Sequence, residues 1–329
     1  MTTRSPHLAA LNPAGSPAFR DHLDTKAASW IRPWDGLEQP DVMLVGAPLS
    51  KSSISHSGAS QTPLAMRDML SSVTTYNIDH DIDLADVLTA CDAGDARVHV
   101  TDLARCRSNI RDAIAVVREM APTSLPVIMG GDHSITAPSV EAFRASVKGG
   151  GMVGLVQLDA HMDLRNLEDG GPSNGTPIRQ LVEAGTVDGQ HIAQVGLHAF
   201  ANARPYREFA RAAGITQITA NEVARTPIEV IVRRALDAAG TGTDSVYVTV
   251  DMDVLDQAFA PGVPAMVPGG MTTWQLFDAL LLLGQDPRVH AVDFVEVDAS
   301  QDPRRATVRA AVHGMLNFLT GVAMRTNAE

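Results

Sequence analysis

Residues 153–163 read VGLVQLDAHMD, and this stretch decides the fold class. An apolar run of strand length, Val153–Leu158, passes directly into Asp159, His161 and Asp163. A continuous apolar run is typical of a parallel strand covered by helices on both faces, because an exposed face would show alternating polar residues. The stretch therefore predicts a buried strand that brings acidic and imidazole groups to one end of a sheet.

Runs of the same kind recur along the chain, separated by helical patterns. The further strands predicted are Val42–Val45, Val127–Met129, Ile192–Val195, Val246–Val250 and Val289–Val295. The amphipathic helices predicted between strands are Leu103–Met120, Pro227–Ala239 and Thr273–Leu283. Alternation of strands and helices over most of the chain indicates an α/β fold with a layered, mostly parallel sheet.

The N-terminal segment, residues 1–40, is predicted to be a loose arm ahead of a single domain at residues 41–329. Within the arm, Ser16 and Pro17 predict the start of a helix that ends near Lys26. Serine is a favourable N-cap, and proline fits the first helical position because its missing N–H has no partner there. No composition shift marks a second domain boundary.

Composition excludes several classes of protein. The chain has 329 residues, 45% of them hydrophobic, and a formal net charge of −12. Such an acidic chain does not suit nucleic acid or an anionic membrane surface, and no apolar run approaches the ~20 residues of a membrane span. Cys91 and Cys106 are too few for a disulfide framework, and residues 1–15 lack the apolar run of a secretion signal. We therefore expect a soluble, cytoplasmic protein.

Three more of the predicted strands run into polar residues. The residues that follow them are Asp132, His133 and Ser134; Asp251 and Asp253; and Glu296 and Asp298. In an open α/β sheet, ligands bind beyond the carboxyl ends of the strands. Four separate segments are therefore expected to bring polar side chains to one edge of the sheet.

Six of these side chains have the pattern of a site for two metal ions. They are His133, Asp159, His161, Asp163, Asp251 and Asp253. Residues two apart in an extended segment point to the same side, and four carboxylates gathered without cations could not all ionise. Carboxylate and imidazole ligands without thiolate suit a hard ion such as Mn²⁺. Each motif alone could be a solvated strand end or a helix cap, but three together favour a metal site.

The motifs also resemble a known family. GGDHS (130–134), DAHMD (159–163), VDMDVLD (250–256) and FVEVD (294–298) are similar in order and spacing to the ureohydrolase family, which includes arginase and agmatinase. The resemblance extends from Val42 to the C-terminus. It implies a three-layer α/β/α fold around a parallel sheet, two Mn²⁺ ions per subunit, assembly into homotrimers or hexamers, and hydrolysis of an amidine or guanidine.

The resemblance also implies roles for individual residues. It assigns one ion to His133, Asp159, Asp163 and Asp251, and the other ion to Asp159, His161, Asp251 and Asp253. A hydroxide between the ions would be the nucleophile, because divalent cations lower the pKa of bound water. Asp163 would pass a proton to the departing amine, and Glu296 would hold the cationic amidine by a charge-assisted hydrogen bond.

One position departs from arginase and agmatinase. Asn174 stands where those enzymes carry a histidine, and asparagine cannot shuttle protons. The strings at 46–51, 53–60 and 253–262 resemble the formimidoylglutamase branch of the family. The resemblance thus implies Mn²⁺-dependent hydrolysis of N-formimidoyl-L-glutamate to L-glutamate and formamide, a step of histidine degradation. The alternatives are a guanidino-acid hydrolase that releases urea and a non-catalytic metal-binding protein.

The expected substrate carries two carboxylates, so cationic side chains near the metal motifs are candidates for binding it. Arg165 comes directly after the DAHMD motif and can hold a carboxylate through two parallel hydrogen bonds. Arg204 is a second candidate, and His198 and Asn174 are further candidate substrate contacts. Asn174 is also a candidate catalytic residue, together with Asp163 and Glu296. Each arginine has the alternative of a solvated surface side chain, and the role of His56 stays open.

Overall fold

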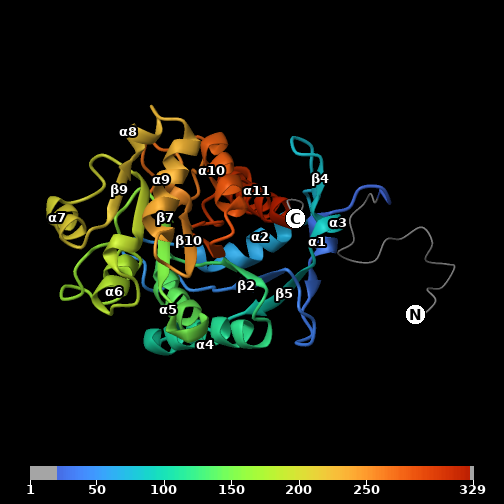
Figure 1. Cartoon of the computed structure of the whole chain (residues 1–329), viewed down its shortest axis with the longest axis horizontal. Helices are drawn as coiled ribbons and strands as arrows, with labels where there is room; N and C mark the ends of the chain where they lie inside the picture. Colours follow the sequence, from blue (N-terminus) through green and yellow to red (C-terminus); the bar gives the residue numbers. More distant parts are fainter. Residues whose placement is uncertain (1–20, 327–329) are drawn as a thin grey trace.

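The structure is a computed structural model and describes residues 21–326. Nine strands, all parallel to their neighbours, form one central sheet in the order β1-β5-β2-β6-β11-β10-β7-β8-β9 (Figure 1). In chain order they are β1 (Arg32–Pro33), β2 (Val42–Gly46), β5 (Ala90–Asp95), β6 (Leu125–Met129), β7 (Val153–Leu158), β8 (Ile192–Leu197), β9 (Thr216–Thr219), β10 (Ser245–Asp251) and β11 (Val289–Val295). A separate antiparallel pair consists of β3 (Tyr76–Asn77) and β4 (Ile82–Asp83).

Helices cover both faces of the sheet, which gives three layers (Figure 1). The first face packs against α2 (Thr62–Leu70), α9 (Ile228–Gly240), α10 (Thr273–Gln285) and α11 (Ala306–Thr326), with the short helices α1 (Ala27–Trp30), α3 (Leu84–Val87) and α8 (Ala220–Val223). The second face packs against α4 (Leu103–Met120), α5 (Thr136–Ser146), α6 (Pro177–Glu183) and α7 (Arg204–Ala212). The prediction of a three-layer α/β/α fold around a parallel sheet is confirmed.

The alternation of side chains along β10 shows how the two cores are built. Val246, Val248 and Val250 belong to the hydrophobic core on the first face, and Tyr247 belongs to the core on the second. Successive side chains of a strand point to opposite faces, so a strand buried on both sides must be apolar throughout. This is why these strands appear in the sequence as continuous apolar runs.

The six predicted strands are all present, with ends that differ by two residues at most. The sequence pattern missed β1, which has only two residues, and it missed β5 and β9, which read ACDAGD and TQIT and contain no apolar run. Both form through pairing with neighbours, since β5 lies between β1 and β2 and β9 pairs with β8 at the sheet edge. Tertiary context thus supplies what local sequence lacks.

The first residues of the helix predicted from Pro17 to Lys26 lie outside the described residues. Its remainder is wrong, because residues 21–26 contain no helix and α1 begins at Ala27. Lys26 instead forms an isolated β-bridge with Thr74. Downstream, the Trp30 ring nitrogen donates to the Leu88 carbonyl oxygen at 2.8 Å. The division of the chain at residue 40 stays a prediction.

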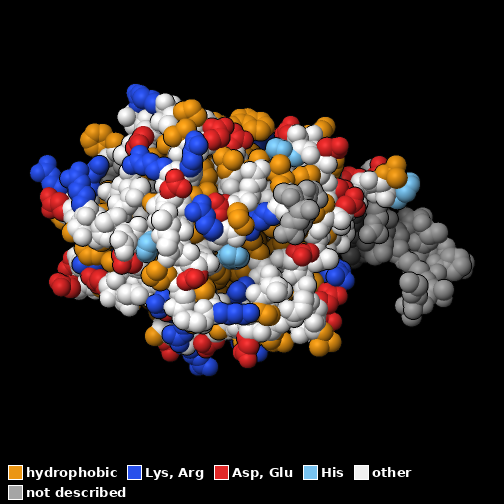
Figure 2. All heavy atoms as spheres, in the orientation of Figure 1, with side chains coloured by type: hydrophobic (Ala, Val, Ile, Leu, Met, Phe, Trp, Pro, Cys, Tyr) orange, Lys and Arg blue, Asp and Glu red, His pale blue; other side chains and the backbone are white. Residues whose placement is uncertain are grey.

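The surface shows how the acidic charge is distributed. Figure 2 shows acidic and basic side chains interspersed on the face seen in Figure 1, so the net charge of −12 is not gathered into one acidic patch there. Among residues 21–326, no helix combines the length and apolar composition that crossing a bilayer requires.

Candidate metal centre

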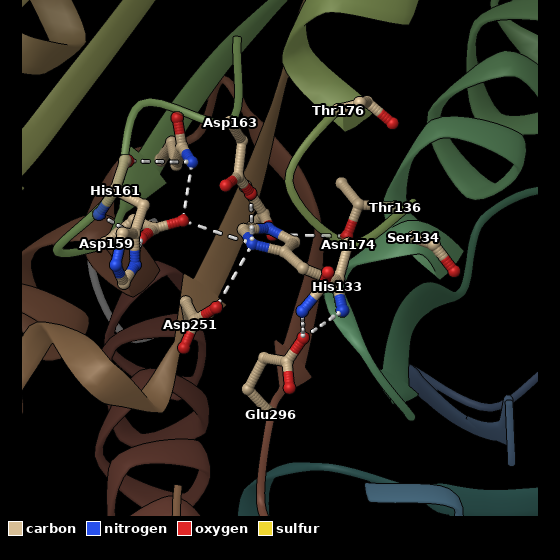
Figure 3. Close-up of polar contacts among 12 residues, drawn as sticks. His133, Ser134, Thr136, Asp159, His161, Asp163, Asn174, Thr176, Asp251 and Glu296 are labelled. Carbon is tan, nitrogen blue, oxygen red and sulfur yellow. Dashed lines mark hydrogen bonds and ion pairs between the residues drawn. The ribbon is translucent and has the colours of Figure 1, made fainter. Parts of the chain in front are cut away.

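Four neighbouring strands bring the predicted site residues together. β6, β11, β10 and β7 lie side by side in the middle of the sheet, and the polar motifs follow their carboxyl ends. Figure 3 shows the resulting cluster, with His133, Asp159, Asp163, Asp251 and Glu296 pointing toward one another. The site lies at the edge of the sheet that the sequence indicated.

His133 stands at the centre of the first group of ligands. Its Nδ1 atom lies 2.8 Å from Asp163 Oδ2, 3.1 Å from Asp159 Oδ2 and 3.2 Å from Asp251 Oδ2. These side chains are buried, with exposed fractions of 1–6%. One imidazole nitrogen thus faces carboxylates from two different strand ends.

His161 forms the second group. Its Nδ1 atom lies 2.8 Å from Asp253 Oδ2 and 3.6 Å from Asp159 Oδ1. The His161 side chain is 28% exposed, so this group opens toward solvent more than the first. The backbone N–H of Ala160 donates to the other Asp253 oxygen at 3.0 Å and fixes that carboxylate.

The loop after β6 needs glycine to reach this position. A Cβ atom on Gly131 would lie 1.8 Å from the Leu49 carbonyl oxygen. That oxygen instead accepts from the Asp132 N–H at 2.7 Å, and the Gly131 carbonyl accepts from the Glu296 N–H at 2.9 Å. Close backbone packing therefore sets His133 next to Glu296.

The charges at the site are crowded. Burial raises the pKa of Asp163 to about 6 and contributes most to raising the pKa of Asp251 well above its ordinary value. Burial opposes the charged form of His133, but the surrounding carboxylates outweigh it and hold that pKa well above the ordinary value. Burial also opposes the charged form of His161, but Asp253 and Asp159 outweigh it and raise the pKa of His161 to about 12. Without another cation, protons on the imidazoles offset the repulsion among the carboxylates.

The donor set fits metal ions. His133 Nδ1 and Asp163 Oδ2 are buried, and apart from the ion-pair contacts within the cluster neither has a hydrogen-bond partner in the part of the chain that the structure describes. Such atoms are rare in proteins, and a cation would satisfy both. Two triads of ligand atoms are close enough to hold an ion each: His133, Asp159 and Asp251, and Asp159, His161 and Asp253. Asp159 belongs to both triads, and oxygen and imidazole donors without thiolate suit Mn²⁺.

Glu296 lies beside the cluster with one oxygen held and the other free. Its Oε1 atom accepts from the His133 N–H at 2.8 Å and from Asn174 Nδ2 at 3.0 Å (Figure 3). Its Oε2 atom is buried and has no hydrogen-bond partner among residues 21–326. Burial, followed by the charge of Asp132, raises the pKa of Glu296 to about 8. A cationic group at Oε2 would supply the missing partner.

Asn174 is held on both sides of its amide. Its Oδ1 atom accepts from the Ile54 N–H at 3.0 Å, while Nδ2 donates to Ser53 Oγ at 3.2 Å and to Glu296. The sequence pointed to Asn174 but missed its partners Ser53 and Ile54, which lie about 120 residues earlier in the chain. Asn174 thus links a distant loop to the Glu296 carboxylate.

Two of these acids have unusual backbone conformations. Asp163 has φ +52° and Glu296 has φ +63°, in the left-handed region that non-glycine residues rarely adopt. Each such residue costs about 1 kcal/mol or more of conformational free energy. Strain of this kind clusters at functional sites, where a side chain must be held in one direction.

Four of the six predicted ligands and Glu296 line a cavity of about 540 Å³ that opens to the surface. Arg165 lines it, and the guanidinium is exposed, with no ion pair or hydrogen bond to the described residues. The Arg165 side chain packs on Gly175, where a Cβ atom would lie 2.7 Å from Arg165 Cδ. Ser55 and Tyr206 also line the cavity, and sequence reasoning missed both.

Two other candidates lie outside this cavity. Arg204, at the start of α7, is exposed and lines an adjoining groove. His198 is buried and faces the same groove, and neither of its ring nitrogens has a partner within residues 21–326. Burial is the main cause that lowers the pKa of His198. His56 is exposed on the loop before α2 and does not line the cavity.

Comparison with known proteins places the chain in a family. The sequence profile of the arginase family matches residues 40–321. The chain belongs to the arginase family. The resemblance inferred from the motifs is therefore confirmed.

Individual relatives narrow the comparison. A formimidoylglutamase from Halalkalibacterium halodurans is 45% identical over 316 residues, which cover 96% of this chain and 98% of the relative. The crystal structure of formimidoylglutamase from Bacillus subtilis is similar with a TM-score of 0.92 and 36% identity, covering 97% of this chain and 99% of that one. A formiminoglutamase from Trypanosoma cruzi, solved with Mn²⁺, shares the fold at 24% identity and a TM-score of 0.83, covering 92% of this chain and 99% of that one.

Proposed function

We propose that this protein hydrolyses N-formimidoyl-L-glutamate to L-glutamate and formamide, with two Mn²⁺ ions held by the six predicted ligands. Relatives bearing the name formimidoylglutamase match it over nearly its whole length, at 45% and 38% identity. Four of the six ligands line one cavity together with the Glu296 carboxylate. An intact ligand set also argues against a protein that only binds metal.

One observation carries the choice of substrate class. The cavity presents two charged groups that have no partner among residues 21–326, namely the buried carboxylate oxygen Glu296 Oε2 and the guanidinium of Arg165. These groups complement a molecule that carries a cationic amidine at one end and carboxylates at the other. A buried charge is stabilised only when it is paired, so Glu296 favours a cationic partner, and Arg165 matches a carboxylate with two parallel hydrogen bonds.

The residues of the site then have distinct parts in the reaction. Bound divalent ions lower the pKa of water toward neutrality and polarise the bond under attack. Glu296 Oε2 orients the amidine, while Asn174 and the His133 N–H hold its other oxygen still. Water adds to the formimidoyl carbon, the bond from that carbon to the glutamate nitrogen breaks, and Asp163 passes a proton to that nitrogen.

A panel of substrates tests the proposal. Protein loaded with Mn²⁺ is incubated with N-formimidoyl-L-glutamate, 4-guanidinobutyrate and agmatine, and formamide, urea and ammonia are measured. We expect formamide and glutamate from the first compound and little turnover of the others. Urea from 4-guanidinobutyrate as the faster reaction would favour the guanidino-acid hydrolase, which Arg165 and Glu296 would also serve. Ammonia with formylglutamate would show that a different C–N bond breaks.

We further propose that the protein works in the cytoplasm as a homotrimer or hexamer. Cys91 and Cys106 are both buried free thiols, which agrees with a reducing compartment. The assembly rests on membership of the arginase family. Light scattering of the purified protein at several concentrations tests it, and a stable monomer would contradict it.

A further inference from the structure

A buried polar chain leads away from His133 on the side opposite the metal ligands. His133 Nε2 lies 2.8 Å from Thr249 Oγ1, and Thr249 Oγ1 donates to Asp293 Oδ1 at 2.5 Å. The other Asp293 oxygen accepts from Thr136 Oγ1 at 2.8 Å and from the Tyr247 hydroxyl at 2.9 Å. All of these side chains are buried, with residue exposures of 0–1%. Asp293 thus gathers three hydroxyl groups inside the sheet.

The register between β10 and β11 brings Asp293 and these hydroxyl groups together. Thr249 of β10 pairs directly with Asp293 of β11, and Tyr247 lies two residues earlier on β10. Thr136 is the first residue of α5, which follows the loop that carries His133. Burying a carboxylate among neutral hydroxyls is costly when no cation pairs with it. Such a cost needs an explanation beyond packing.

The direction of each hydrogen bond follows from an inventory of hydrogens. An ionised carboxylate has none to give, so Thr249, Thr136 and Tyr247 must each donate their single hydroxyl hydrogen to Asp293. Once Thr249 has donated, its oxygen can only accept from His133 Nε2. His133 Nε2 must therefore carry a hydrogen, and the neutral ring keeps its lone pair on Nδ1. That is the nitrogen facing Asp159, Asp163 and Asp251.

We propose that Asp293 is a positioning residue that acts through Thr249 to hold His133 in the tautomer and orientation that bind the first metal ion. This inference rests on the metal pair of the proposed function. Metal-bound histidines generally donate their other ring N–H to a fixed acceptor, and losing that acceptor weakens metal affinity roughly 10–100-fold. Here the acceptor is a hydroxyl, and the buried carboxylate behind it sets the direction of that hydroxyl.

The second histidine provides an internal comparison. His161 Nδ1 faces Asp253 and Asp159, but its other ring nitrogen has no hydrogen-bond partner in the described part of the chain, and the side chain is partly exposed. The buried chain from Asp293 reaches His133 alone among the six ligands. Disruption of this chain is therefore expected to lower the affinity for the ion at His133 and to leave the affinity for the ion at His161 and Asp253 nearly unchanged.

Four variants test the proposal by manganese titration. Thr249→Val keeps the shape and removes the hydroxyl, so we expect the affinity of one ion to fall roughly 10–100-fold while the other changes less than about threefold. Thr249→Ser restores a hydroxyl and is expected to restore the affinity. Tyr247→Phe is the matched control, since it removes one buried donor to Asp293 and leaves the link from Thr249 to His133. Asp293→Asn keeps the side-chain volume and is expected to lower the affinity for the same ion. This variant tests the proposal independently if Thr249→Val does not fold.

Calorimetry and the electron paramagnetic resonance spectrum of Mn²⁺ give the readouts. We expect the Thr249→Val spectrum to change from that of a coupled pair to that of a single ion at intermediate metal concentration. Two ions bound as tightly as in the wild type, or an equal loss at both positions, would overturn the role of Asp293. Failure of the wild-type protein to bind two ions would instead overturn the metal pair of the proposed function.

Discussion

The buried Glu296 carboxylate is expected to make the stability of the metal-free protein depend on pH, in the absence of substrate. Burial, with the charge of Asp132 second, raises the pKa of Glu296 from the ordinary 4.5 to about 8. Between these two values the folded protein holds a proton that the unfolded chain has released. The free energy of unfolding of the metal-free protein therefore falls as the pH rises through this interval. Glutamine resembles protonated glutamate and does not titrate, so Glu296→Gln removes this fall.

The magnitude follows from the two pKa values. At about 1.4 kcal/mol for each pH unit, the interval from 4.5 to about 8 corresponds to about 5 kcal/mol. The metal-free Glu296→Gln protein is expected to exceed the wild type by about this free energy at pH 9, and by less than about 1 kcal/mol at pH 5. For a chain of 329 residues, about 5 kcal/mol is about 7 °C in Tm.

Unfolding of chelator-treated protein at several pH values between 5 and 9 measures the effect. Glu208→Gln is the matched control, because Glu208 is exposed on α7. We expect the Glu208→Gln curve to follow the wild type and the Glu296→Gln curve to diverge upward as the pH rises. Curves for Glu296→Gln and wild type that stay parallel from pH 5 to pH 9 would refute the reasoning.

Three further predictions concern the metal and the substrate. Asp251→Asn is expected to abolish binding of at least one ion and to lower activity at least about 1000-fold, because a metal ligand loses its charge. Metal analysis after dialysis measures the occupancy, and full occupancy by two ions would contradict the prediction. The affinity for Mn²⁺ is expected to rise from pH 6 to pH 8, because neighbouring carboxylates raise the pKa values of His133 and His161 and both rings must lose a proton to bind the metal. Calorimetry at three pH values measures the affinity, and an affinity that does not change with pH would contradict the assignment of these two ligands. Arg165→Lys is expected to raise KM for the dicarboxylate substrate roughly 10-fold and to change kcat by less than about threefold, since lysine cannot form two parallel hydrogen bonds to a carboxylate. Steady-state kinetics measure both constants, and an unchanged KM would show that Arg165 does not bind the substrate.

The sequence indicated the metal cluster well because one physical rule connects pattern and position. Apolar runs that end in acids or histidines mark parallel strands, and the carboxyl ends of such strands meet at one edge. Asp159, Asp251 and Glu296 could therefore be assigned to one site without a structure. The rule says nothing of which strands are neighbours. The resemblance to the ureohydrolase family implied that Asp159 serves both ions, and the structure places Asp159 in both ligand triads.

Other parts of the site could not be predicted from local pattern. Ser53 and Ile54 hold Asn174 from a loop far away in sequence, and no periodicity marks such a contact. Arg204 is cationic and near the motifs, yet its place on α7 turns it to the adjoining groove. Asp293 did give a signal, an acid inside the apolar run from Val289 to Val295, because a buried carboxylate in a strand requires a partner.

The sheet order has a consequence for how the chain is assembled. β11 is the last strand to be synthesised, but it lies between β6 and β10, so it joins a half made of residues 32–129 to a half made of residues 153–251. Until residue 295 has left the ribosome, His133 sits on one half and the five other ligands sit on the other. Binding of the ion at His133 is thus expected to be a late event in biosynthesis, whereas Asp159, His161 and Asp253 already lie together on one half.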